Sequence, residues 1–127
     1  MWDERKNNVK VLLVEDAPFL RYAFGRLLRL HGFEVCEANN GHEALAHVND
    51  FRPDLVVTDL MMPVMDGVEL IRRLRQDPRT AELPVLAITA DASETTGTRV
   101  RQAGAADCIT KPVDLPILLE RLRSIRS

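Results

Sequence analysis

The sequence has few of the features that mark export, membrane insertion or nucleic-acid binding. Its 127 residues contain 17 Lys and Arg against 19 Asp and Glu, so a net charge of −2 gives no strong positive field for nucleic acid or anionic lipid. No apolar run approaches the roughly 18 residues that a membrane-spanning helix needs, and the start, MWDERKNN, is polar and charged. We therefore expect no direct nucleic-acid binding, no membrane insertion and a cytoplasmic location.

Cysteines, aromatic residues and glycine motifs are also scarce. Cys36 and Cys108 are far apart and belong to no C-x-x-C pair, which favours buried free thiols and a reducing compartment. No glycine is followed by lysine, which excludes a P-loop nucleotide site. Aromatic residues make up only 5% of the chain, so aliphatic side chains must fill the core, and the length suits one domain.

Short apolar segments alternate with helical patterns along the chain. Runs rich in Val, Ile and Leu predict five strands, at 9–14, 33–38, 54–58, 84–89 and 107–110. Several are apolar without alternation, as in the strands of a parallel sheet covered on both faces. Apolar residues three and four positions apart, with capping signals, predict five helices. They run from Leu20 to a stop at His31-Gly32, over 41–49, from Asp66 through Leu74, over 92–103, and after Asp114.

The fivefold alternation of strand and helix predicts the fold class. It indicates an α/β protein with a doubly wound, five-stranded parallel sheet in the flavodoxin-like (βα)5 order 2-1-3-4-5. In this order the cysteines lie on opposite edge strands, about 19 Å apart, so no disulfide is expected. We expect residues 1–8 to form a flexible arm and 9–127 one domain. The segment Thr95 to Thr98 is a poor helix former, so the helix at 92–103 is either a loose surface element or a segment that moves.

Polar residues mark the carboxyl ends of the predicted strands. Glu15 and Asp16 follow the first strand, Asp59 the third and Lys111 the fifth, and Thr89 ends the fourth. Because the carboxyl ends of parallel strands lie at one edge of the sheet, we expect these side chains to converge. Carboxylates roughly 4 Å apart repel by about 1 to 4 kcal/mol per pair, depending on the dielectric. A cation must therefore lie among them.

Lys111 and a bound divalent ion would supply the positive charge. Mg²⁺ suits two or three carboxylates that leave positions for water and a phosphate oxygen, whereas zinc prefers His or Cys, which these strand ends lack. Such a site would make Asp59 a nucleophile toward phosphorus, with Thr89 donating a hydrogen bond to the phosphoryl group. Each residue alone also has a structural interpretation, and only their joint placement favours this chemistry.

The ordered set of motifs VLLVEDAP, TDLMMPVMDG, LAITA and AGAADCITKP resembles the response-regulator receiver domain, the phospho-acceptor module of two-component signalling. The similarity spans about 9–127. It implies that Asp59 accepts a phosphoryl group from a histidine kinase or a histidine phosphotransfer protein and controls a downstream protein target, without independent substrate turnover. It also implies Mg²⁺, which Mn²⁺ could replace, held by Asp16, Asp59 and the Met61 carbonyl with assistance from Glu15.

The resemblance also defines a switch region of Thr89, Ala90, Cys108, Lys111 and Pro112. In such proteins the threonine shifts toward the phosphoryl group, the lysine pairs with the acceptor, and the Lys111-Pro112 bond is often cis. Relatives similar to the chemotaxis regulator carry an aromatic residue where this chain has Cys108, and a thiol cannot sweep the same volume. The output is therefore expected to travel through the loop before the helix at 92–103. Whether this helix and the last one form a weak dimer stays open.

Other classes of protein share parts of these patterns. An FMN carrier of the same topology needs a Gly, Ser or Thr loop after the first strand, and EDAPF there would repel phosphate. A phosphatase with an aspartyl nucleophile usually shows a second acid two residues later, where Met61 stands. The closest rival is a pseudo-receiver that is not phosphorylated and acts as a protein-interaction module.

Overall fold

Five strands and five helices alternate in the computed structural model, which describes residues 9–126. They are β1 (Lys10–Val14), α1 (Pro18–Leu30), β2 (Glu34–Ala38), α2 (Gly41–Phe51), β3 (Leu55–Asp59), α3 (Gly67–Gln76), β4 (Val85–Thr89), α4 (Glu94–Ala103), β5 (Asp107–Thr110) and α5 (Leu115–Arg126). Every strand agrees with its predicted range to within one residue at each end. The expected arm at 1–8 lies outside the described residues.

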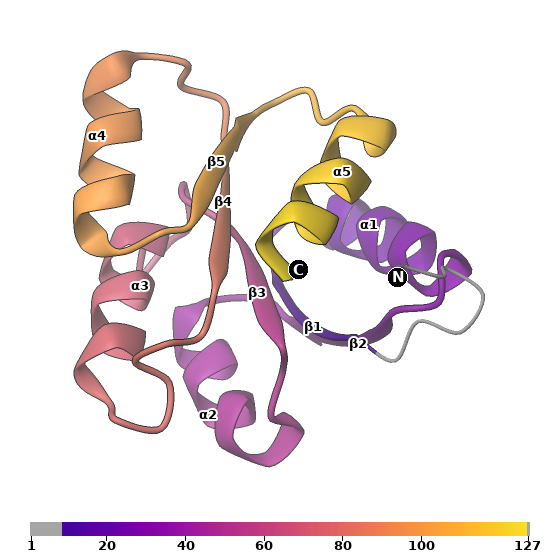
Figure 1. The fold of residues 1–127 in the computed structure, drawn as a ribbon, viewed down its shortest axis with the longest axis horizontal. Coiled ribbons are helices and arrows are strands. Elements are labelled where there is room, and N and C mark those ends of the chain that lie inside the picture. Colours follow the sequence, from indigo (N-terminus) through magenta and orange to yellow (C-terminus); the bar gives the residue numbers. More distant parts are fainter. Residues whose placement is uncertain (1–8, 127) are drawn as a thin grey trace.

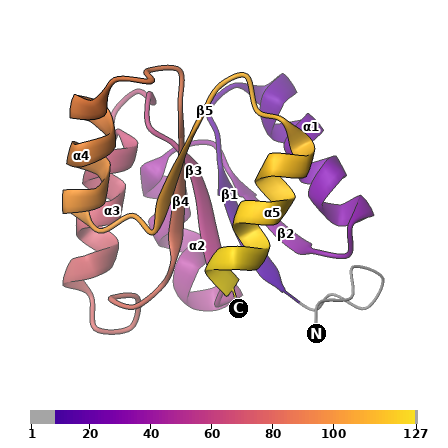
Figure 2. The ribbon, with the colours of Figure 1, turned by 45° about the horizontal axis from the view of Figure 1, so that its top comes forward.

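The strands form one parallel sheet in the order β2-β1-β3-β4-β5, which confirms the predicted fold class. Helices α1 and α5 cover one face, and α2, α3 and α4 cover the other (Figures 1 and 2). The register places Val14 beside Thr58, Asp59 beside Ile88, and Thr89 beside Thr110. The carboxyl ends of β1, β3, β4 and β5 therefore lie at one edge.

Two aliphatic clusters, one on each face of the sheet, form the core. All residues of β3 and β4 are buried, which accounts for the apolar runs LVV and VLAI at the start of these strands. On one face the strands pack against Val48, Ile71 and Val100 of α2, α3 and α4. On the other they pack against Leu28 of α1 and Leu122 of α5. Each such buried side chain contributes about 1.5–3 kcal/mol, so the central strands form a firm base for their carboxyl ends.

The helix ends differ in part from the predicted ranges. Helix α2 continues to Phe51, beyond the predicted end at 49. Helix α4 begins at Glu94 instead of at 92, because the Ser93 hydroxyl accepts the Thr96 N–H and caps the helix there. Asp66 caps α3 as predicted by accepting the Glu69 N–H. None of the described helices combines the length and the apolar character that crossing a bilayer requires.

Both cysteines lie on edge strands and are free thiols, as predicted. They are half-buried, however, so the expectation that the thiols are buried was wrong. The reason is that β2 and β5 each have one open side, and most of their residues keep some exposure. Burial is still sufficient to raise the pKa of the Cys36 and Cys108 thiols, so both stay protonated near neutral pH.

Helix α4 buries the fewest residues of the five described helices. Val100 is its one buried residue, whereas α3 buries five, including Leu70, Ile71 and Leu74. The sequence Thr95-Thr96-Gly97-Thr98 adds little intrinsic helix propensity. Few buried contacts and low propensity together make α4 a segment that opens at low free-energy cost.

We expect Gly97→Ala to raise the free energy of unfolding by about 0.5–1 kcal/mol, because alanine loses less conformational entropy in a helix interior. An added Cβ would meet only the Arg101 guanidinium, 3.2 Å from its Nη1 atom, which is the mobile end of a long side chain. Urea unfolding measures the change. Gly104→Ala is the control and should destabilise, because Gly104 has φ +113° and its Cβ would lie 2.8 Å from Arg75 Nε. An unchanged or lower stability of Gly97→Ala would contradict this account of α4.

Candidate functional site

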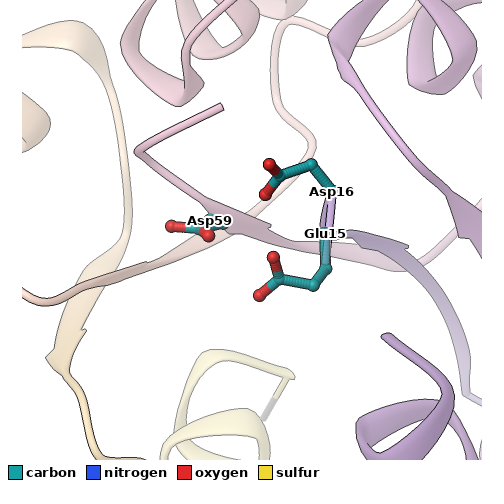
Figure 3. A group of neighbouring side chains, drawn as sticks. All are labelled: Glu15, Asp16 and Asp59. Atoms are coloured by element: carbon teal, nitrogen blue, oxygen red, sulfur yellow. The ribbon is translucent and has the colours of Figure 1, made fainter. Parts of the chain in front are cut away.

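Three carboxylates meet at the carboxyl edge of the sheet. Glu15 and Asp16 follow β1, and Asp59 ends β3. One oxygen from each lies within 4.8 Å of the others, and Figure 3 shows the three side chains turned toward the same space. Glu15 is 3% exposed and Asp59 6%, so water screens their mutual repulsion only in part.

Lys111 supplies the positive charge that contacts this cluster. Its Nζ atom lies 3.1 Å from Asp59 Oδ2 and 3.5 Å from Glu15 Oε1. The Lys111 N–H donates to the Thr89 carbonyl at 2.7 Å, which fixes the start of the β5–α5 loop against β4. The peptide bond between Lys111 and Pro112 is cis, as the resemblance implied. The structure thus brings Glu15, Asp16, Asp59 and Lys111 together, as the sequence predicted.

Backbone N–H groups orient two of the carboxylates. The Met61 N–H donates to Asp59 Oδ1 at 3.1 Å, so each oxygen of Asp59 has one donor, from Met61 or from Lys111. The Ala17 N–H donates to Glu15 Oε2 at 3.2 Å. These contacts hold both groups with defined orientations on the rigid ends of β1 and β3.

The charges at the site do not balance. Burial raises the pKa of the Glu15 carboxyl to about 7, and the charge of Asp59 adds to this rise against the opposing effects of the Ala17 N–H and Lys111. Burial also disfavours the charged form of Lys111, but its hydrogen bond to Asp59 and the charges of Asp59 and Glu15 outweigh it, so the pKa of Lys111 is raised. One lysine therefore offsets only part of the charge of three carboxylates.

The donor set fits a hard divalent cation. Carboxylate oxygens from Glu15, Asp16 and Asp59 are the ligands that Mg²⁺ and Mn²⁺ prefer, and these oxygens are near enough to share one ion. Two positive charges would also offset the excess negative charge described above. The contribution of the Met61 carbonyl stays a prediction. The Met61 side chain itself is 72% exposed at the rim of the site.

Thr89 lies at the same edge, with its hydroxyl engaged in a contact that the sequence did not reveal. The side chain is 1% exposed, and its Oγ1 accepts the Asp91 N–H at 3.0 Å. Asp91 in turn accepts from the Thr96 hydroxyl at 2.6 Å and from the Ser93 N–H at 2.9 Å. Hydrogen bonds thus connect Thr89 to the first turn of α4. A hollow of about 460 Å³ lies beside this connection, and its lining includes Thr89, Asp91 and Met61.

The other members of the predicted switch region surround this connection. Ala90 and Pro112 are exposed, on the loops that follow β4 and β5. Cys108 pairs with Ala87 in the sheet, and its side chain lines a smaller hollow of about 180 Å³ with Ser93 and other residues of the α4 N-terminus. The thiol therefore lies where it faces α4.

Arg21 is a residue at the site for which the sequence analysis assigned no role. Its Nη1 atom donates to the Glu15 carbonyl at 2.9 Å. The signal in the sequence is an arginine one turn into the helix that follows the acidic pair. A hydrogen bond from a side chain to the backbone does not depend on the identity of its acceptor residue, so nothing else in the sequence predicts this contact.

The fold and the site together define the class of the protein. It is a flavodoxin-like α/β protein that carries an acidic cluster and a lysine at the carboxyl edge of its sheet. The family model described as the response regulator receiver domain matches residues 11–123. The chain belongs to this family, the receiver domains of two-component signalling.

Individual relatives agree with this assignment. PilH of Pseudomonas aeruginosa is 34% identical over 116 residues, which cover 91% of this chain and 96% of PilH. The structure of the chemotaxis response regulator CheY4 of Vibrio cholerae superimposes with a TM-score of 0.88 at 31% identity, over 94% of this chain and 99% of that one. The phosphate regulon regulatory protein PhoB of Pseudomonas aeruginosa is 36% identical over 115 residues, but the match spans 91% of this chain and only 50% of PhoB.

Without divalent ions, we expect the free energy of unfolding to fall as the pH rises from about 4.5 to about 7. An unfolded Glu15 releases its proton near the lower value and the folded one near the higher, so the folded state binds more protons between them. The Glu15→Gln variant lacks this titrating group, so its free energy of unfolding should not fall in the same way. Relative to the wild type, its free energy of unfolding should rise across the window by on the order of 1–3 kcal/mol. Urea unfolding in EDTA on both sides of the window measures the difference.

Glu34→Gln, at an exposed position of β2, is the matched control and should follow the wild-type pH profile. Added Mg²⁺ should stabilise the wild type more above the window than below it, because the ion binds the deprotonated carboxylates. Parallel pH profiles for wild type and Glu15→Gln would show that Glu15 is not the group responsible.

Proposed function

We propose that Asp59 is the phospho-acceptor in a Mg²⁺-dependent transfer from a phosphohistidine donor, and that its phosphorylation changes the surface formed by β4, α4 and β5. The observation that carries the proposal is the contact of a nearly buried Asp59 with Lys111 inside an acidic cluster. A carboxylate placed in this way is held in a fixed orientation close to a cation, which suits a nucleophile.

The transfer conserves atoms and charge in one step. A carboxylate oxygen of Asp59 forms a bond to phosphorus while the bond from phosphorus to the histidine nitrogen breaks, and that nitrogen leaves with the electron pair. The product is an acyl phosphate on Asp59. Lys111, 3.1 Å from Asp59 Oδ2, neutralises charge beside the acceptor and is positioned to pair with the phosphoryl oxygens.

Asp16, Asp59 and the Met61 carbonyl, with assistance from Glu15, would hold Mg²⁺, and the ion would supply positive charge that offsets the negative phosphoryl oxygens. Mn²⁺ could substitute for Mg²⁺, because it accepts the same oxygen ligands. The acidic cluster of the structure supports this assignment. The chain is its own phosphoryl acceptor and, in this proposal, no enzyme that turns over an independent substrate.

A protein donor is supported by apolar side chains that lie exposed around the acceptor. Phe19 is 80% exposed in the first turn of α1, and Val64 and Met61 are 85% and 72% exposed in the loop after β3. All three follow the carboxyl ends of β1 or β3. We therefore assign the donor to a cytoplasmic histidine kinase or histidine phosphotransfer protein, and the output to a downstream protein target.

The connection from Thr89 to α4 supports the output route. A Thr89 hydroxyl that turns toward a phosphoryl group alters its hydrogen bond with the Asp91 N–H, and Asp91 holds Thr96 in the first turn of α4. Weak anchorage of α4 makes it responsive to such a change. Cys108 is too small to provide the aromatic switch, so the loop between β4 and α4 carries the signal in its place.

We expect acetyl phosphate with Mg²⁺ to add one phosphoryl group to the wild type and none to Asp59→Asn. Intact-protein mass spectrometry measures the addition. The control is Asp66→Asn, which removes an exposed carboxylate from the same loop and keeps a good helix cap. It should be phosphorylated like the wild type. Unmodified wild-type protein under these conditions would favour the pseudo-receiver.

We expect Thr89→Val to uncouple α4 from the acceptor, whereas Cys108→Ala should not. Valine keeps the shape of the side chain and removes only the hydroxyl. In ¹H–¹⁵N NMR spectra, phosphorylation of the wild type and of Cys108→Ala should move the amide signals of Asp91, Ser93 and Thr96. These signals should move much less in phosphorylated Thr89→Val. The reverse order of effects would place the output route on Cys108.

A further inference from the structure

The two acids that follow β1 need a backbone that departs from strand geometry. Successive side chains of an extended strand point to opposite faces of the sheet, yet Glu15 and Asp16 both direct an oxygen into the cluster with Asp59. The strand accordingly ends at Val14, and the chain bends at Asp16 and Ala17. The peptide between Glu15 and Asp16 sets this change of direction.

Arg21 is the side chain that holds this peptide. Its Nη1 atom donates to the Glu15 carbonyl at 2.9 Å, while the Glu15 N–H remains in the sheet through its bond to the Ala38 carbonyl at 3.0 Å. The carbonyl of Glu15 belongs to the peptide between the two acids, so its direction constrains the backbone from which both side chains project. The guanidinium thus acts on the acidic cluster from behind, without contacting any of its carboxylates.

Arg21 is itself held by charged neighbours. Its Nε atom lies 3.6 Å from Oε1 of Glu37 on β2, and Arg29 lies 2.9 Å from the other Glu37 oxygen and also donates to the Val35 carbonyl at 3.1 Å. Gly25 leaves room for this network in the middle of α1, because a Cβ there would lie 3.0 Å from Glu37 Oε2 and 3.2 Å from Arg29 Nη1.

We propose that Arg21 is a positioning residue for the metal site: it fixes the peptide between Glu15 and Asp16 so that both carboxylates are arranged for a divalent cation before the ion binds. The inference rests on the proposed function only in that the acidic cluster binds Mg²⁺. Groups that orient metal ligands from behind commonly account for 10–100-fold in metal affinity.

Charge and positioning predict opposite effects when Arg21 is replaced. Arg21→Met removes a positive charge near an acidic cluster, which by charge alone would strengthen Mg²⁺ binding or leave it unchanged. Loss of the hydrogen bond to the Glu15 carbonyl would instead weaken Mg²⁺ binding. Arg21→Lys keeps the charge but lacks the planar guanidinium that reaches the carbonyl and Glu37 together. A positioning role therefore predicts weaker binding for both variants, and a charge effect predicts it for neither.

The test is a Mg²⁺ titration of the full chain at a pH above the raised pKa of Glu15. Binding is monitored through the ¹H–¹⁵N NMR signals of the Asp59 and Met61 amides. We expect the dissociation constant to rise about tenfold in Arg21→Met and by a smaller factor in Arg21→Lys. Arg26→Met, at an exposed position of the same helix, is the charge-matched control and should bind as the wild type does or slightly more tightly. Urea unfolding in EDTA verifies that each variant is folded during the titration.

Wild-type affinity in both Arg21 variants, or tighter binding by Arg21→Met, would overturn the positioning role and leave the phospho-acceptor proposal intact. A wild type that shows no Mg²⁺ binding would overturn the metal site and this inference with it. A variant that loses stability but keeps its Mg²⁺ affinity would show that Arg21 only joins α1 to β2.

Discussion

The chemistry of the site depends on one electrostatic constraint, the confinement of three carboxylates and a single lysine in nearly buried space. The sheet order creates it by placing β1 beside β3, so Glu15 and Asp59 cannot separate without breaking strand pairing. Lys111 offsets part of the charge. The remaining excess of negative charge raises the proton affinity of Glu15 in the absence of metal, and it is the same excess that a divalent cation would neutralise.

Most of the fold and the main site residues could be predicted because they depend on chain direction and burial alone. Strands covered on both faces contain apolar runs without polar alternation, which allows β3 and β4 to be recognised in the sequence. Once the strands are placed, Asp59 and Lys111 must fall at the carboxyl edge, since all strands of a parallel sheet point the same way. The acidic cluster could therefore be predicted without knowing any side-chain conformation.

The contacts that could not be predicted depend on local geometry. The bond from Arg21 to the Glu15 carbonyl exists because the chain bends after β1, and the bond from Asp91 to Thr89 exists because the loop after β4 turns back on itself. Both hydrogen bonds join a side chain to the backbone. Neither requires a periodic pattern of residues in the sequence, so neither could be recognised there. The partial exposure of Cys36 has a related origin, since an edge strand and a central strand can have equally apolar sequences.

The two sides of the site differ in how firmly they are held, and this difference would direct the proposed signal toward one side. Toward α1, the backbone of Glu15 is fixed by Arg21, and α1 is anchored by ion pairs to β2 and by Leu28 in the core. Toward α4, the connection from Thr89 reaches a helix with one buried residue and a sequence of low helix propensity. In the proposed function, a change of charge at Asp59 would act on both sides, but the free-energy cost of displacement is expected to be lower for α4. On this proposal the rigid side would keep the metal-binding carboxylates in place while the weakly anchored α4 responds.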